Sequence, residues 1–310
     1  MLLQTLGVDD YGVYNIIGGV VVLFSFLSTA MNNSTQRYLN YNIGLNDNSK
    51  ASKVFSTSMQ AHYLIAAIVL ILAETVGLWF VNTQLNIPAE RMIAAKWVYQ
   101  FSVITSIVNI VRTPYNASVI AYENMSFFAY TSIAEKSLGL AIVFLLSAGH
   151  FDKLILYSFL LCILSVIIWG VYSFYCRKRY EICKYKPIKD KPLLKELLSF
   201  TWWYLFGGLA MVGSKQGVNI ILNIFFNVAV NAAVGVANQV RGAIFSFITS
   251  FQTAFNPQIV KLYASGQIEE LNTLIFRATK FSFFLMFMMS LPIIVCCKEI
   301  ILLPKIRTAC

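Results

Sequence analysis

Eight apolar runs of about 20 residues constrain this chain more than any other feature of its sequence. A helix needs about 20 apolar residues to cross roughly 30 Å of hydrocarbon. The composition agrees, because 58% of residues are hydrophobic and only 12% are charged, unlike ordinary soluble domains. The runs are too long for barrel strands, so we expect an all-α, polytopic integral membrane bundle. The expected spans are 11–31, 60–82, 94–115, 127–148, 154–175, 198–221, 232–254 and 279–302.

Lysine and arginine predict the orientation of these spans. Alternate loops hold 15 of the 24 basic residues, and short cytoplasmic loops are the ones that retain positive charge. Both termini are then expected outside, and a further helix is expected upstream because the first apolar run lacks the features of a signal peptide. The loops expected in the cytoplasm are 32–55, 112–126, 176–197 and 257–281.

No residue pattern indicates an enzyme, a metal site or a cofactor. The six cysteines form no CxxC pair and have no ligand spacing with the two histidines. A membrane glycosyltransferase or polymerase would need a clustered acid pair, and the only adjacent aspartates, Asp9 and Asp10, are expected in a short outer loop.

An internal repeat appears at a shift of 223 residues. GVYNIIGGVVVLFSFLSTAMNN (12–33) aligns without gaps on GVANQVRGAIFSFITSFQTAFN (235–256), and a one-residue shift then pairs YNIG (41–44) with YASG (263–266). The first span thus recurs as the seventh, which indicates two parallel six-helix units, as in many transporters. We therefore expect eight helices cut from a bundle of at least twelve.

The repeated span 232–254 carries a stripe of small and polar residues on one helical face. Such a stripe is typical either of tight helix packing or of a water-filled cavity. The candidate polar lining residues are Asn238, Asn231 and Gln239 on this segment and Asn219 on the preceding span.

Arg241 lies about nine residues, or roughly 14 Å, into its span. An arginine near the midplane costs about 2.5 to 3.5 kcal/mol even on the most permissive scale. Lys136 and Lys215 also lie within spans, although Lys136 could pair with a carboxylate and Lys215 could reach the surface. Together the three bases predict a cationic cavity for an anionic ligand.

Glu74 and Glu135 are the main acidic residues within the spans. We expect them to act as counter-ions, and either could instead carry a proton. Glu135 is a poor partner for the adjacent Lys136, because neighbouring helix positions point about 100° apart.

Three segments resemble one transporter family. SKQGVNIILNIFFNVAVNAAVGVANQVRGAIFSFITSFQTAFNPQI (214–259) resembles the opening of the second lobe in bacterial O-antigen and capsule flippases. These form the polysaccharide-transporter branch of the multidrug/oligosaccharidyl-lipid/polysaccharide exporter superfamily. LGVDDYGVYNIIGGVV (6–21) is similar to that family's second helix, and PYNASVIAYENMSFFAYTSIAEKSLGL (114–140) to its fourth-to-fifth helix connection.

The resemblance implies twelve to fourteen helices in two lobes, of which this chain holds helices two to nine. Residues 1–175 would form an incomplete N-terminal lobe with helices two to six. Residues 176–197 would form a basic cytoplasmic loop between the lobes, and residues 198–310 an incomplete C-terminal lobe with helices seven to nine.

The implied function is a flippase in the bacterial inner membrane. It would translocate an undecaprenyl-pyrophosphate-linked oligosaccharide, the repeat unit of O-antigen, capsule or exopolysaccharide, by alternating access. Its partners would be this lipid-linked oligosaccharide, membrane lipids and polysaccharide assembly proteins. Arg241, Lys136 and Lys215 would contact the pyrophosphate or acidic sugars, and the asparagines would bond sugar hydroxyls.

Two other interpretations stay open. A cation-coupled multidrug exporter of the same superfamily would favour an acidic or aromatic cavity over three buried bases. A non-functional fragment would account for the missing helices. Nucleic-acid binding is not expected, because the net charge of +10 is largely explained by the basic loop 176–197.

Overall fold

A computed structural model of the chain describes residues 8–83, 85, 88–146, 152–187, 190–225 and 228–296. These residues form helices and the turns between them, with no strand among them. The chain divides into two compact units, Met1–Leu205 and Phe206–Cys310, which are described separately below. The boundary falls inside the helix Lys191–Phe225.

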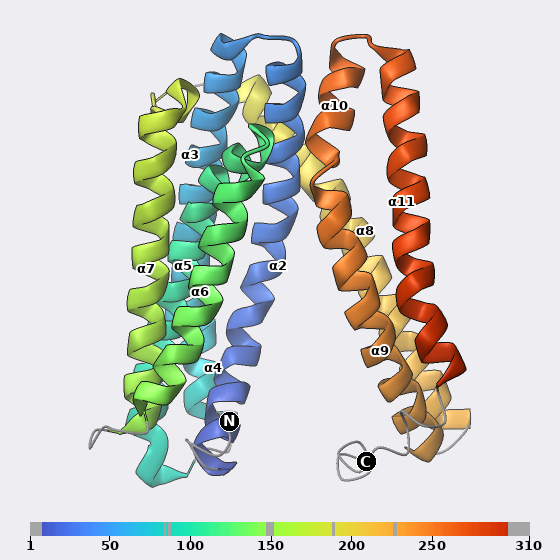
Figure 1. Cartoon of the computed structure of the whole chain (residues 1–310). Coiled ribbons are helices and arrows are strands. Elements are labelled where there is room, and N and C mark those ends of the chain that lie inside the picture. The colour runs from blue at the N-terminus through green and yellow to red at the C-terminus, as the bar shows by residue number, and fades with distance from the viewer. Residues whose placement is uncertain are drawn as a thin grey trace. The chain divides into compact units, whose positions relative to one another are not determined.

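Unit 1 is a bundle of long antiparallel helices (Figure 1). α2 contacts α3 and α5, and α5 contacts α7, while the first part of α8 is tied to α2 by bonds such as that from the Ser34 hydroxyl to the Leu197 carbonyl at 3.2 Å. The helices are α2 (Val8–Gly44), α3 (Asn48–Leu72) with a π-helical turn (Ala73–Gly77) and α4 (Leu78–Thr83), α5 (Met92–Ala121), α6 (Met125–Leu145), α7 (Lys153–Arg179) and α8 (Lys191–Phe225).

Unit 2 contains the remainder of α8 together with α9 (Val228–Thr253), α10 (Asn256–Ala264) and α11 (Ile268–Val295). α11 runs back along α10 and α9 and contacts both of them (Figure 1). Pro257 stands in the first turn of α10, where the missing N–H has no helical partner to lose.

All eight predicted spans coincide with these helices, and three of them run a few residues past a helix end, at 146–148, 254 and 296–302. Residues 147–148 and 297–302 are outside the described residues. The polytopic helical membrane fold is thereby confirmed. Among the described residues, five helical segments are long and apolar enough to cross a bilayer: Asn48–Thr83, Met92–Ala121, Met125–Leu145, Lys153–Arg179 and Ile268–Val295. The predicted spans 11–31, 198–221 and 232–254 lie in α2, α8 and α9.

Three helical hairpins share one kind of tight turn. Asn46, Glu123 and Gly266 each adopt a left-handed conformation, with φ of 56°, 58° and 75°, which ends the preceding helix. The residue that follows begins the next helix as its N-cap. In the first two turns this residue is Asp47 or Asn124, whose side chain accepts a bond from the third backbone N–H of the new helix.

The predicted loops 32–55 and 112–126 are wrong over most of their length, because only residues 45–47 and 122–124 lie outside helices there. α2 has 37 residues and α5 has 30, which makes them about 55 and 45 Å long. Both exceed the roughly 30 Å of a hydrocarbon core. Hydropathy marks the bilayer crossing, whereas the helices continue beyond it into more polar surroundings.

The two copies of the internal repeat are both helical, in α2 and α9, but their alignment shifts at the turns that follow. The N–H of Asp47 bonds to the Asn42 carbonyl, and that of Gln267 bonds to the Leu262 carbonyl, each at 3.0 Å. These equivalent turns are 220 residues apart, not the 222 that the YNIG and YASG pairing predicts. The difference arises because α2 continues unbroken, whereas α9 ends at Thr253 and α10 starts afresh beside Pro257.

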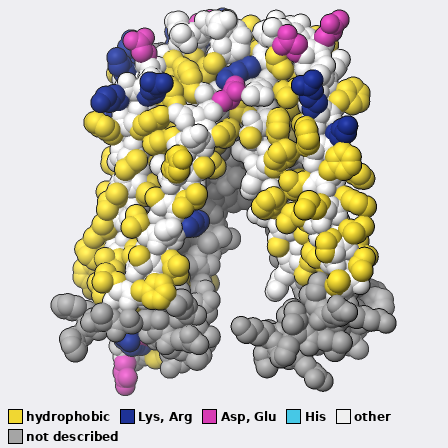
Figure 2. All heavy atoms as spheres, viewed as in Figure 1, with side chains coloured by type: hydrophobic (Ala, Val, Ile, Leu, Met, Phe, Trp, Pro, Cys, Tyr) yellow, Lys and Arg dark blue, Asp and Glu magenta, His cyan; other side chains and the backbone are white. Residues whose placement is uncertain are grey.

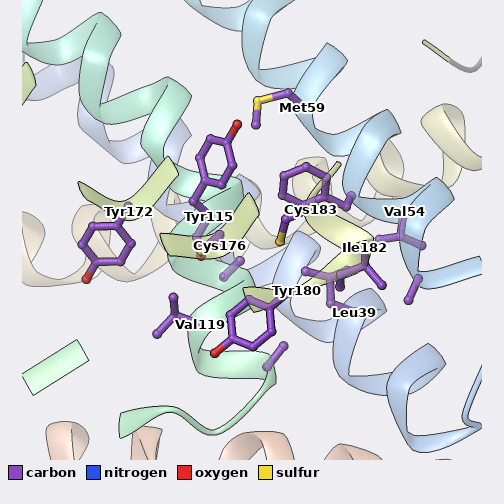
Figure 3. Close-up of a cluster of buried hydrophobic side chains, with 14 of the residues drawn as sticks. Leu39, Val54, Met59, Tyr115, Val119, Tyr172, Cys176, Tyr180, Ile182 and Cys183 are labelled. Atoms are coloured by element: carbon purple, nitrogen blue, oxygen red, sulfur yellow. The ribbon is translucent and has the colours of Figure 1, made fainter. Parts of the chain in front are cut away.

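A buried cluster closes unit 1 at the end that carries its turns (Figure 3). Side chains from α2, α3, α5 and α7 meet there, with Tyr115 and Cys176 among the most buried. The chain after α7 joins this cluster through Tyr180, Ile182 and Cys183. The start of the segment 176–197 belongs to α7 and its end to α8. Between them, Tyr180, Ile182 and Cys183 are buried against unit 1, whereas residues 184–187 are exposed.

Arg91 joins three helices at the opposite end of unit 1. Its guanidinium donates to Asp152 at 2.6 Å and to Asp10 at 2.9 Å. Asp152 is the N-cap of α7, and Asp10 is buried within α2 rather than in the predicted outer loop. One arginine thus fixes the starts of α2, α5 and α7 relative to one another.

Arg91→Met should lower the free energy of unfolding by about 2 kcal/mol, since the buried Asp10 carboxylate then loses a charged donor. Thermal or denaturant unfolding of the detergent-solubilised protein measures this change. Lys50→Met is the control, because Lys50 pairs with Asp47 on an exposed surface. Equal losses in the two variants would contradict the structural role of Arg91.

Candidate functional site

Glu74 lies within a predicted span, in the π-helical turn Ala73–Gly77. Such turns occur often at functional sites. Tyr99 stabilises this one by donating its hydroxyl to the Ala73 carbonyl at 2.8 Å, and Gln100 donates its amide to the Glu74 carboxylate at 3.2 Å. Gly77 completes the turn, because a Cβ there would overlap the Tyr99 hydroxyl. Glu74 is thus held by a neutral donor, and its side chain is exposed.

A second charged group joins α5, α6 and α7. Arg112 donates to the Glu135 carboxylate at 3.0 Å, and these side chains are 21% and 34% exposed. The Arg112 guanidinium also lies 5.7 Å from the ring centre of Tyr172, whose hydroxyl is 3.0 Å from that of Thr131. Arg112 was expected in a cytoplasmic loop, yet it lies in α5 and neutralises Glu135.

Lys136 follows Glu135 on α6 but points elsewhere, as the 100° step between helix positions requires. Its side chain is exposed, and no carboxylate of the described residues forms an ion pair with it. Glu135, which the sequence already marks as a poor partner for Lys136, pairs with Arg112 instead. Lys136 is therefore available to an anion within unit 1.

In unit 2, α9 is the most amphipathic of the long helices. Asn238, Gln239 and Arg241 are all exposed on it, and no ion pair of Arg241 occurs among the described residues. No described atom lies within 4 Å of a Cβ built on Gly235 or Gly242. The small residues of this stripe thus remain open within the described part of unit 2.

Three further candidates have side chains outside the described residues. Lys215 and Asn219 belong to α8, and Asn231 belongs to α9. Their helical positions are as predicted, and their roles stay predictions.

Charge is unevenly distributed along the helices. Figure 2 shows hydrophobic side chains over the flanks of the helices, with Lys and Arg gathered near the ends that carry the turns. Exposed aromatic and aliphatic residues such as Ile71, Ile167 and Phe283 cover the flanks, as lipid contact requires. Among the described residues, no group of His, Cys, Asp and Glu could hold a metal ion.

Gln100, Arg112 and Tyr172 belong to these groups, and the sequence alone does not single them out. A usable signal existed for Arg112, which lies eleven residues before Glu123, while Glu135 lies eleven residues after Asn124. Residues equidistant from a tight turn face each other in an antiparallel hairpin. Predicting the pair required the position of the turn, which hydropathy does not give.

Known proteins share both a sequence region and the fold. Residues 205–305 match the MatE family model, and no curated protein matches the chain. A crystal structure of a MATE mutant has a TM-score of 0.81 and 13% identity, covering 96% of this chain and 68% of that one. An outward-facing MATE multidrug resistance transporter of the MOP superfamily gives a TM-score of 0.78 and 14% identity, covering 98% of this chain and 67% of that one.

A MOP superfamily transporter from Pyrococcus furiosus gives a TM-score of 0.69 and 14% identity, covering 94% of this chain and 69% of that one. That protein is described as having a binding pocket of reverse polarity, which suggests a different function for it. At these identities the similarity shows the fold. The chain therefore has the fold of MOP superfamily transporters and, over residues 205–305, a sequence similar to the MatE family.

Glu135→Gln should lower the free energy of unfolding by about 1 to 3 kcal/mol, because it leaves the half-buried Arg112 without its counter-charge. Combining it with Arg112→Gln should recover part of this loss. Thermal unfolding in detergent provides the measurement. Lys136→Gln, a change on the next residue, should have little effect, and a loss as large as that of Glu135→Gln would contradict the pairing.

Proposed function

We propose that this chain forms the transport region of a multidrug exporter of the MATE type. The observation that carries the proposal is the MATE fold over 96% of the chain, supported by the MatE match at residues 205–305. This favours the drug-exporter alternative over the polysaccharide flippase. Its cargo would be an amphipathic organic molecule moved by alternating access, and the chain would carry out no covalent chemistry.

Glu74 is the residue we assign to energy coupling. An intramembrane carboxylate can take up and release a proton during a transport cycle, provided that no fixed cation holds it ionised. Glu135 is bound to Arg112, whereas the hydrogen-bond donor at Glu74 is the neutral Gln100. The π-helical turn around Glu74 also gives the helix a local irregularity that can rearrange.

A flippase for lipid-linked oligosaccharide in the bacterial inner membrane is the second candidate. Lys136 and Arg241 favour it, because both are exposed cations within helices and lack an ion pair among the described residues. Such cations suit a pyrophosphate. The Pyrococcus furiosus transporter, with its pocket of reverse polarity, is consistent with the idea that this fold accommodates ligands of different charge.

Transport by the whole protein in proteoliposomes distinguishes the two candidates. A multidrug exporter should move ethidium, and Arg241→Ala or Lys136→Ala should leave that rate unchanged or higher, since each removes a positive charge. A flippase should instead move lipid-linked oligosaccharide, with a loss of about tenfold in either variant. Lys50→Ala, at an exposed turn, is the control. Absence of ethidium transport alongside oligosaccharide transport would overturn the first proposal.

Glu74→Gln should reduce ethidium export driven by a pH gradient by about tenfold or more, because the coupling carboxylate is lost. Initial rates at several external pH values give the measurement, and the remaining export should no longer depend on the gradient. Glu90→Gln, in the outer 3₁₀ turn Ala89–Arg91, is the matched control. An unchanged pH dependence in Glu74→Gln would remove Glu74 from the coupling mechanism.

A further inference from the structure

A cavity of about 600 Å³ opens at the end of unit 1 that carries its helical turns. One wall is the beginning of α3, and the other is the segment that follows α7. Glu74, Lys136 and Arg241 do not contribute to its lining. Among its lining residues are Lys53, Tyr122, Arg179, Tyr180, Glu181 and Lys186.

The charges of this cavity are predominantly positive. Lys53, Arg179 and Lys186 face a single acid, Glu181, and none of the three forms an ion pair among the described residues. The three cations come from two different segments, so they surround the cavity rather than follow one helix face. Ser49, Ser52 and Asn48 add neutral hydrogen-bond donors.

The N-terminus of α3 contributes little to this attraction. Asp47 already accepts the Lys50 N–H at 2.9 Å, and this backbone donor lowers the pKa of the Asp47 carboxyl. The N-terminus of α3 is therefore already occupied by the Asp47 carboxylate. Binding would depend on the side chains of Lys53, Arg179 and Lys186.

The walls of the cavity are fixed by packing. The rings of Tyr122 and Tyr180 stack at 4.2 Å with an angle of 4° between them, and Asn124 donates to the Tyr180 hydroxyl at 3.3 Å. Burial raises the pKa of Tyr180 to about 12, so its phenol stays neutral. The Lys186 N–H donates to the Ser56 hydroxyl at 3.2 Å, which holds the second wall against α3.

We propose that this cavity binds a phosphate-bearing anion. Three convergent cations with adjacent hydroxyls match the charge and acceptor oxygens of a phosphate group. Ser52 lies eight residues, or about 12 Å, before the apolar run that begins at 60, and Arg179 lies about 6 Å beyond the run that ends at 175. The cavity thus extends from the headgroup layer into water, and either an anionic lipid headgroup or a soluble phosphate compound can reach it.

Occupation of the cavity would link α3 to the segment that leads into α8. The bound anion would neutralise cations on both walls and so stabilise their contact. This site is independent of the cargo, and its test measures binding rather than transport.

The test uses the whole protein in nanodiscs. In one arm, phosphatidylcholine nanodiscs are titrated with radiolabelled inorganic phosphate. In the other arm, phosphatidylglycerol is added to the bilayer and bound lipid is counted by native mass spectrometry. Saturable binding of phosphate in the first arm identifies a soluble source, and binding confined to the second identifies a headgroup.

The double variant Lys53→Gln with Lys186→Gln should weaken binding by about tenfold or more, because it removes a cation from each wall. The matched control is Lys50→Gln with Lys184→Gln, which changes the same charge on the same two segments outside the cavity. Lys53→Arg with Lys186→Arg should retain binding. Absence of saturable binding in both arms, or equal weakening by the control, would overturn the proposal.

Discussion

The tight turn between antiparallel helices is the constraint on which the rest of this structure depends. Each turn places one residue in the left-handed region and starts the next helix immediately afterwards. Because both helices then rise at the same rate, residues equidistant from the turn lie at the same depth. Arg112 meets Glu135 eleven residues either side of the turn at Glu123 and Asn124.

The same geometry sets other polar contacts. Thr35 and Ser58 lie eleven residues before Asn46 and after Asp47, and their hydroxyls are 2.5 Å apart. Since an unpaired polar group is costly in hydrocarbon, a shift of one residue in a turn would separate every such pair. The turns therefore fix the membrane-embedded chemistry as well as the topology.

The sequence predicts the helical membrane fold and the order of its long helices, because apolar length reports the bilayer directly. It does not predict where helices end, since α2 and α5 continue well beyond their apolar runs. For the same reason the sequence predicts a loop at Arg112 and an outer connection at Asp10, although both residues lie in helices. Within the candidate site, Glu74, Lys136 and Arg241 can be selected from the sequence, because each is a charged residue inside an apolar run. Their partners could not, because Gln100 and Tyr172 have no unusual character until the helices are packed.

The proposed MATE-type exporter needs a ligand that matches its intramembrane charges, and those charges are mixed. Glu74 is acidic with a neutral donor, Arg112 is neutralised by Glu135, and Lys136 and Arg241 are exposed cations. Equilibrium binding of ethidium to the purified full protein, followed by fluorescence anisotropy, tests the account most directly. We predict saturable binding that a second cationic dye displaces. The account is contradicted if ethidium does not bind while an undecaprenyl-pyrophosphate oligosaccharide does.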